Sequence, residues 1–198
     1  MLAPWQPLLE WWFGWGTSPQ DVADEKSTLW FGKQHDAEAH ERFGALVEQA
    51  LAGGLEEWLE SPQGWLGLVL LLDQLPRMIY RDTPRAFDGD RRAQVLVMQG
   101  LDRAWDYQLL PLQRVFILLV LEHAEVLDWQ NTCVERYQTL LDAQPTADRR
   151  LFEGFLDYAE QHQRVIARFG RFPHRNLVLG RPSTSEEMDF LLEPGSRF

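Results

Sequence analysis

Apolar residues recur every three or four positions along most of the chain, which is the spacing of one face of an α-helix. The stretch 36–54 shows this most clearly, because its Gly-Gly end follows apolar residues at helical spacing: Phe43, Leu46, Val47, Ala50 and Leu51. Alternating strand-like runs joined by an Asn-Gly or Asp-Gly turn do not occur. The pattern therefore predicts an all-α protein.

Proline, glycine and capping residues divide the chain into about eight helices. Ser61 and Pro62 favour the start of one helix, Gly170 favours the end of another, and Pro76 is expected to kink or end a third segment. The expected helices cover 4–13, 36–54, 61–80, 90–105, 111–144 as one helix or two, 145–168, and a short segment after 183.

The length of 198 residues suits a single domain, 1–198, in which residues 170–198 form a C-terminal tail packed over the helices. The most apolar stretch, WLGLVLLLDQLP, is interrupted by Asp73, well short of the ~18 apolar residues that span a membrane. The first residues lack a basic region and a long apolar run. We therefore expect a cytoplasmic protein with no membrane partner.

Charge and cysteine content narrow the class of function. The chain has 30 acidic and 19 basic residues and a formal net charge of −11, which argues against a nucleic-acid partner. A single cysteine, Cys133, excludes an internal disulfide and a cysteine-ligated metal framework. The H-E-x-x-H, G-x-S-x-G and Walker A motifs are absent, so we expect no metal and no cofactor. The oligomeric state stays open.

Charged and polar residues follow the two most apolar helices directly. They are Asp73, Gln74, Arg77 and Arg81 after LVLLL, and Glu122, His123 and Glu125 after VFILLVL. Asp73, Arg77 and Arg81 are spaced at i, i+4 and i+8 and share one helix face. Charges in such apolar surroundings need partners. They form either structural arginine–carboxylate pairs or part of a binding site.

A basic stretch lies near the C-terminus of this acidic chain. Between Gln161 and Ser185 there is no Asp or Glu, and there are five arginines: Arg164, Arg168, Arg171, Arg175 and Arg181. His174 adds a group that titrates near neutral pH. The stretch either binds a phosphate or carboxylate ligand or tethers the C-terminal tail.

Two further histidines, His123 and His162, have acidic neighbours in the sequence, Glu125 and Glu160. A carboxylate that orients an imidazole ring is typical of general acid–base catalysis. A histidine that only makes structural hydrogen bonds within a helix gives the same local pattern, and this alternative stays open.

Several long motifs resemble one bacterial family. LLDQLPRMIYRDTPRAF and RFGRFPHRNLVLGRPSTSEEMDFL, together with WWFG, LWFGK and EHAE, are similar to the domain-of-unknown-function family 924 over roughly 8–192. The resemblance implies a tetratricopeptide-like superhelix of antiparallel helix pairs and no established activity. The family's H-S-E motif is His123-Ala124-Glu125 here, which removes a hydroxyl. Its recurrent polar positions fall on Asp73, Gln74, Arg77, Tyr80, Arg81, His123, Glu125, Gln130, His162, Arg168, Arg171, His174, Arg175 and Asn176.

These observations leave three interpretations. In the first, the protein binds a small phosphorylated or carboxylated ligand and performs acid–base chemistry. In the second, a concave helical surface binds a partner peptide. In the third, the polar residues only stabilise the fold. For the first we expect catalytic roles for His123, Glu125, His162 and His174, and ligand binding by Asp73, Gln74, Arg77, Arg81, Arg168, Arg171, Arg175 and Asn176.

Overall fold

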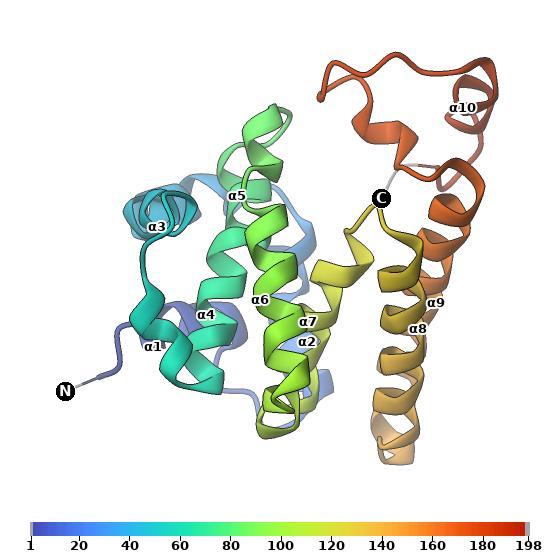
Figure 1. The fold of residues 1–198 in the computed structure, drawn as a ribbon. Coiled ribbons are helices and arrows are strands. Elements are labelled where there is room, and N and C mark those ends of the chain that lie inside the picture. The colour runs from blue at the N-terminus through green and yellow to red at the C-terminus, as the bar shows by residue number, and fades with distance from the viewer. Residues whose placement is uncertain (1, 197–198) are drawn as a thin grey trace.

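The computed structural model describes residues 2–196, which form helices joined by short turns and no β-strand (Figure 1). The all-α prediction is confirmed. The α-helices are α1 (Gln6–Phe13), α2 (Pro19–Phe31), α3 (Asp36–Leu51), α4 (Pro62–Leu72), α5 (Gln74–Ile79), α6 (Asp90–Asp102), α7 (Pro111–Glu122), α8 (Leu127–Asp142), α9 (Thr146–Phe169) and α10 (Ser185–Phe190). Four 3₁₀ turns separate them, η1 (Glu56–Glu60), η2 (Pro84–Phe87), η3 (Trp105–Gln108) and η4 (Pro173–Arg175).

Capping residues begin and end the helices largely where the sequence places them. The Ser61 hydroxyl accepts a hydrogen bond from the Gly64 N–H at the start of α4. Thr184 caps α10 and forms a capping box with Glu187. Gly170 ends α9 with φ 68°, a left-handed conformation that favours glycine. Local hydrogen bonding therefore fixes these boundaries.

The structure has more helices than the roughly eight expected. The predicted helix over 61–80 divides at Asp73 into α4 and α5. Pro76 causes this break, because its ring would clash with the Leu72 carbonyl in a continuous helix. Helix α2 has no strong apolar face and was not predicted. It is held by tertiary contacts, including a hydrogen bond from Trp30 Nε1 to the Trp12 carbonyl.

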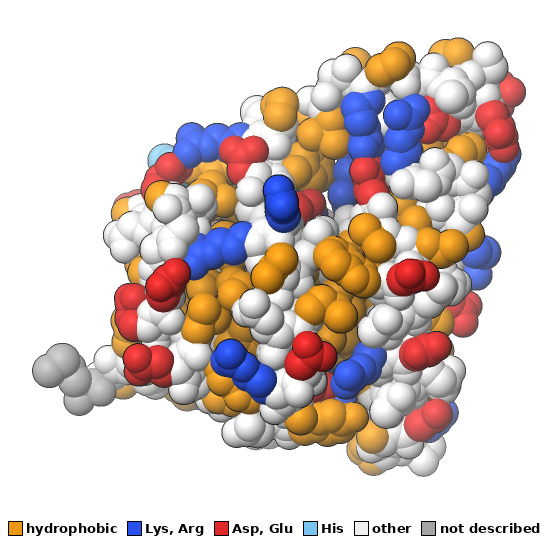
Figure 2. All heavy atoms as spheres, in the orientation of Figure 1, with side chains coloured by type: hydrophobic (Ala, Val, Ile, Leu, Met, Phe, Trp, Pro, Cys, Tyr) orange, Lys and Arg blue, Asp and Glu red, His pale blue; other side chains and the backbone are white. Residues whose placement is uncertain are grey.

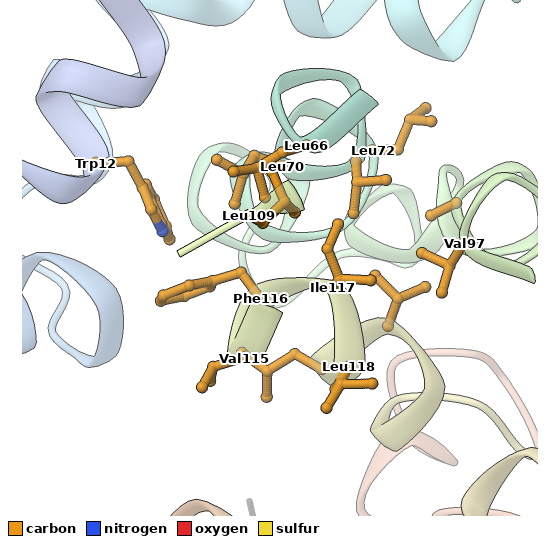
Figure 3. Close-up of a cluster of buried hydrophobic side chains, with 14 of the residues drawn as sticks. Trp12, Leu66, Leu70, Leu72, Val97, Leu109, Val115, Phe116, Ile117 and Leu118 are labelled. Carbon is orange, nitrogen blue, oxygen red and sulfur yellow. The ribbon is translucent and has the colours of Figure 1, made fainter. Parts of the chain in front are cut away.

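The core is built around α4 and α7, which are buried almost throughout (Figure 3). The Phe116 ring of α7 packs edge-on against Trp12 of α1, with ring centroids 5.4 Å apart. Leu66 and Leu70 of α4 lie near Ile117 of α7 in the same cluster. Burial on all sides explains the continuous apolar runs of both helices. The charged residues that follow these runs are consequently carried to the edge of the core.

Neighbours in sequence are also neighbours in space over much of the chain, and α8 and α9 lie side by side (Figure 1). After α9 the chain passes over the junction between α7 and α8, where Arg175 donates to the His123 carbonyl. The predicted tail extends to residue 198, and residues 197–198 lie outside the described residues. Within residues 2–196, the helices are each too short or too polar to cross a membrane. The assignment of 1–198 to one domain stays a prediction.

Candidate functional site

A cavity of about 700 Å³ lies where faces of α2, α5, α7 and α9 meet. Each helix contributes residues spaced three or four apart, as one helical face requires. The α9 face consists of Leu151, Gly154, Phe155, Tyr158 and His162. The polar lining groups are Ser27, Gln74, Arg77, Arg81, Glu122, His123 and His162. Charged residues at the ends of the apolar runs thus meet at this cavity.

Behind the cavity wall, Asp73 orients the ring of His123. The Asp73 side chain is 1% exposed, and its two oxygens lie 2.8 and 3.0 Å from His123 Nδ1. Gln74 Nε2 donates to the same carboxylate at 2.7 Å, and Arg77 lies 3.1 Å from it. Burial alone would raise the pKa of Asp73, but Arg77, His123 and Gln74 outweigh burial and lower it. Asp73 is therefore ionised and fixes the proton of His123 on Nδ1.

The second ring nitrogen of His123, Nε2, then carries a lone pair. Burial lowers the pKa of His123, and the cations Arg77 and Arg175 lower it further, while Asp73 acts in the opposite direction. The ring is consequently neutral at neutral pH. A neutral imidazole oriented by a carboxylate is suited to accept a proton from a bound molecule.

A second carboxyl–imidazole contact lines the cavity beside the first. Glu122 Oε1 lies 3.3 Å from His162 Nδ1, and the same nitrogen donates to the Tyr158 carbonyl at 2.9 Å. Burial and the negative charge of Asp73 raise the pKa of Glu122 to about 8. Burial lowers the pKa of His162 to about 3. Both groups are therefore uncharged at pH 7, and Glu122 is a protonated acid rather than half of an ion pair.

Two arginines line the cavity, Arg77 in α5 and Arg81 just after it, and each is paired with a carboxylate outside the lining. Arg77 binds Asp90 through two hydrogen bonds of 2.8 and 3.0 Å. Arg81 binds Asp36 in the same way, at 2.7 and 2.8 Å. The arginines are part of the cavity lining, whereas Asp36, Asp73 and Asp90 are not. With Glu122 protonated, the ionised groups of the lining are cations.

The C-terminal basic stretch binds the junction between α7 and α8 instead of the cavity. Arg181 forms hydrogen bonds of 2.6 and 2.9 Å with Glu125, which also accepts the Phe172 N–H at 2.8 Å. Arg175 donates to the His123 carbonyl at 2.9 Å and stacks on the Phe172 ring, 4.4 Å from its centroid. Burial lowers the pKa of Arg175 to about 10. These contacts fix the backbone on either side of Ala124.

The remaining predicted residues make contacts within residues 168–190, from the end of α9 to α10, which we call the C-terminal segment. Arg171 binds Glu187 at 2.6 and 2.8 Å, and Asn176 donates to the same carboxylate at 3.2 Å. Arg168 lies 3.0 Å from Glu186. Figure 2 shows basic and acidic side chains gathered together over this segment, at the upper right.

The fourth predicted catalytic histidine, His174, also lies in this C-terminal segment. Its ring contacts Phe172, with centroids 5.6 Å apart. Burial and the charge of Arg175 lower the pKa of His174 to about 4. The ring is consequently uncharged at neutral pH.

The structure thus divides the single predicted site into two. Gln74, Arg77, Arg81, His123 and His162 line the cavity, with Asp73 directly behind them. The other predicted residues lie outside the lining, in the contacts of the C-terminal segment: Glu125, Arg168, Arg171, His174, Arg175 and Asn176. Among residues 2–196, no cluster of three or more His, Cys, Asp or Glu side chains has a metal-binding arrangement.

The sequence did not predict the cavity-lining residues of α2, nor those of α9 other than His162. Trp30 and Phe31 come from the helix that was not predicted. Gly154 is a glycine inside a helix without a capping role, which is a signal that the sequence does contain. Phe155 and Tyr158 follow it on the same face and have the ordinary spacing of core residues.

Comparison with known proteins places the chain in a family. Residues 8–195 match the family described as "Bacterial protein of unknown function (DUF924)". The structure of a protein of unknown function from Agrobacterium tumefaciens is similar, with 32% sequence identity and a TM-score of 0.74. The similarity covers 88% of this chain and 96% of that one. No curated protein matches the chain. The resemblance seen in the motifs is confirmed, and the chain belongs to the DUF924 family.

Proposed function

We propose that the cavity binds a small organic anion, carboxylated or phosphorylated, and that His123 transfers a proton to or from it. The observation that carries this proposal is the Asp73–His123 pair, which adjoins a cavity whose ionised lining groups are Arg77 and Arg81. A volume of about 700 Å³ lies within the range of small-molecule sites. Perturbed titratable groups in a cavity favour chemistry over a purely structural role.

Each polar group has a distinct part in this proposal. Arg77 and Arg81 attract the anionic group of the ligand, and their carboxylate partners hold the guanidinium groups in place. His123 Nε2 accepts a proton, with Asp73 stabilising the imidazolium that forms. The protonated carboxyl of Glu122 donates a proton or a hydrogen bond on the same wall.

A tetratricopeptide-like superhelix that binds a peptide is the alternative. Its support is the sequential packing of neighbouring helices, such as α7, α8 and α9. Peptide binding in a groove also depends on exposed apolar anchors gathered on one surface. Two exposed apolar residues, Phe31 and Tyr158, line the cavity that holds the titratable groups. The others come from several elements, for example Trp15 before α2, Val95 in α6, Tyr107 in η3 and Leu177 after η4. We therefore favour the small-ligand proposal.

Thermal unfolding with a panel of carboxylated and phosphorylated compounds tests the proposal. The wild-type melting temperature should rise with at least one anion. Arg81→Gln should abolish that rise. The matched control is Arg168→Gln, which changes an arginine of the C-terminal segment outside the cavity and should leave the rise intact. Equal responses of the two variants, or no response of the wild type to any anion, would contradict anion binding.

The proton-transfer step has its own measurement. ¹⁵N NMR of the His123 ring should show a proton on Nδ1 and none on Nε2 in the free protein. His123→Asn should then bind the same anion and lose any turnover of it. A ring that is doubly protonated at pH 7 would contradict the role of His123 as a base.

A further inference from the structure

We propose that the ligand of this cavity is an elongated amphipathic anion, and that Gly154 of α9 provides the room for its apolar body. The inference rests on the proposed function, because it names the ligand class of the same site. It comes from the other side of the cavity, where the lining is apolar and where one position has no side chain.

Apolar walls extend from the interior of the cavity to its opening. Trp30 and Leu119 are buried, at 6% and 9% exposure. Phe31 and Tyr158 are 65% and 56% exposed and form the outer part of the lining. Phe155 lies on the α9 face between Gly154 and Tyr158. A wholly polar metabolite would leave these surfaces in contact with water, whereas an apolar chain or ring would cover them.

Gly154 is an exposed residue at the edge of the cavity lining. It lies inside α9, where glycine is less favourable than alanine by about 1 kcal/mol. An ideal Cβ built on Gly154 meets no atom within 4 Å. Packing therefore does not require a glycine here, and the backbone does not require one either, because Gly154 lacks a positive φ such as that of Gly170, which ends the same helix. A side chain at this position of the lining would therefore enter open space.

Leu151 and Gly154 lie at the opposite end of the α9 face from His162, while Tyr158 lies beside His162 with ring centroids 6.3 Å apart. Gly154 precedes His162 by eight residues, which corresponds to about 12 Å along a helix axis. His162 lies against Glu122, whose neighbour His123 is the proposed base. A ligand that reaches both ends must be elongated. Its anionic group then lies near the arginines and histidines, and its apolar body lies against Gly154 and the aromatic side chains.

Isothermal titration calorimetry with acetate, hexanoate, octanoate, decanoate and 1-octanol tests this inference. For the wild type, affinity should rise about fourfold per added methylene group from hexanoate to decanoate. Gly154→Ala should keep that rise. Gly154→Phe should weaken decanoate binding at least tenfold and leave acetate binding unchanged. The matched control is Glu153→Phe, which places the same ring on an exposed neighbouring position of α9.

The possible results separate this inference from the proposed function. If the short carboxylates bind and chain length has no effect, the amphipathic ligand is wrong and anion binding stands. Equal losses in Gly154→Phe and Glu153→Phe would also overturn the role of Gly154. If 1-octanol binds as tightly as octanoate, the apolar body is supported and the anionic group is not. If none of the five compounds binds, this inference fails, whereas the proposed function is decided by its own panel, which also contains phosphorylated compounds.

Discussion

Replacing Glu122 with glutamine tests whether the acid of the cavity is protonated in the folded protein. Glu122 ends α7, is 3% exposed and lies 3.3 Å from His162 Nδ1. Burial, together with the charge of Asp73, raises the pKa of Glu122 from 4.5 to about 8. Glutamine has nearly the shape of the protonated acid and does not titrate. The substitution therefore removes the titration and keeps the volume.

The raised pKa of Glu122 makes the folded protein less stable as the pH rises. Between pH 4.5 and pH 8 the folded protein retains a proton that the unfolded chain releases, so stability falls with increasing pH. The contribution is fully present below pH 4.5 and fully lost above pH 8. One proton corresponds to about 1.4 kcal/mol per pH unit. From about pH 5.5 to about pH 7.5, Glu122 therefore lowers the free energy of unfolding by about 2.5 kcal/mol.

Urea unfolding monitored by tryptophan fluorescence at both pH values measures this contribution. Glu122→Gln should lose about 2.5 kcal/mol less stability than the wild type over that interval. Glu125→Gln is the matched control on the same chain segment. Burial opposes the shift, but Arg181 and the Phe172 N–H lower the pKa of Glu125, so its carboxylate is stabilising above its unfolded pKa and its loss should destabilise at both pH values. Parallel pH dependences for wild type and Glu122→Gln would show that Glu122 is ionised, and would refute the reasoning.

Three other substitutions test the packing around the site. Arg175→Met should cost about 1–3 kcal/mol in urea unfolding, because the buried His123 carbonyl loses its donor, and the pKa of His123 measured by NMR should rise as a nearby cation is removed. Gly89→Ala should cost about 1–3 kcal/mol, because its Cβ would lie 2.0 Å from the Leu72 carbonyl oxygen. Trp12→Ala should cost about 3–5 kcal/mol in the same assay, because the Trp12 side chain is fully buried. An unchanged midpoint for any of the three would contradict the contact named for it.

Much of the fold was predictable because local signals decide it. Ser61, Pro62 and Gly170 mark helix ends through backbone hydrogen bonds that neighbouring residues supply. Helix α2 was not predictable in the same way. Its residues have no strong apolar face, and the contacts that hold it, such as Trp30 with Trp12, join distant parts of the chain. Tertiary packing there overrides a weak local preference.

The composition of the site was predictable in part, but the pairing of its charges was not. The sequence places Asp73, Arg77 and His123 just after the buried helices α4 and α7. Both helices end at the same edge of the core, so these side chains meet there. Asp73 precedes Arg81 by eight residues and would share its face on a continuous helix, yet Arg81 binds Asp36, which is 45 residues distant. Helix α5 ends at Ile79, so Arg81 leaves the face that carries Asp73. Which carboxylate an arginine binds depends on distances in the folded protein, and the spacing of residues along the sequence does not give these distances.

The basic C-terminal stretch has a clear physical relation to the cavity even though it lies outside the lining. The residues from Glu122 to Glu125 are contacted from both sides: Glu122 and His123 face the cavity through their side chains, while Arg175 holds the His123 carbonyl and Arg181 holds Glu125. Because Arg175 and Arg181 lie outside the cavity lining, the proposed binding of an anion depends on Arg77 and Arg81, which line it. In the proposed function, the C-terminal segment would act on proton transfer by fixing the backbone that carries His123, and by placing the charge of Arg175 where it lowers the pKa of His123.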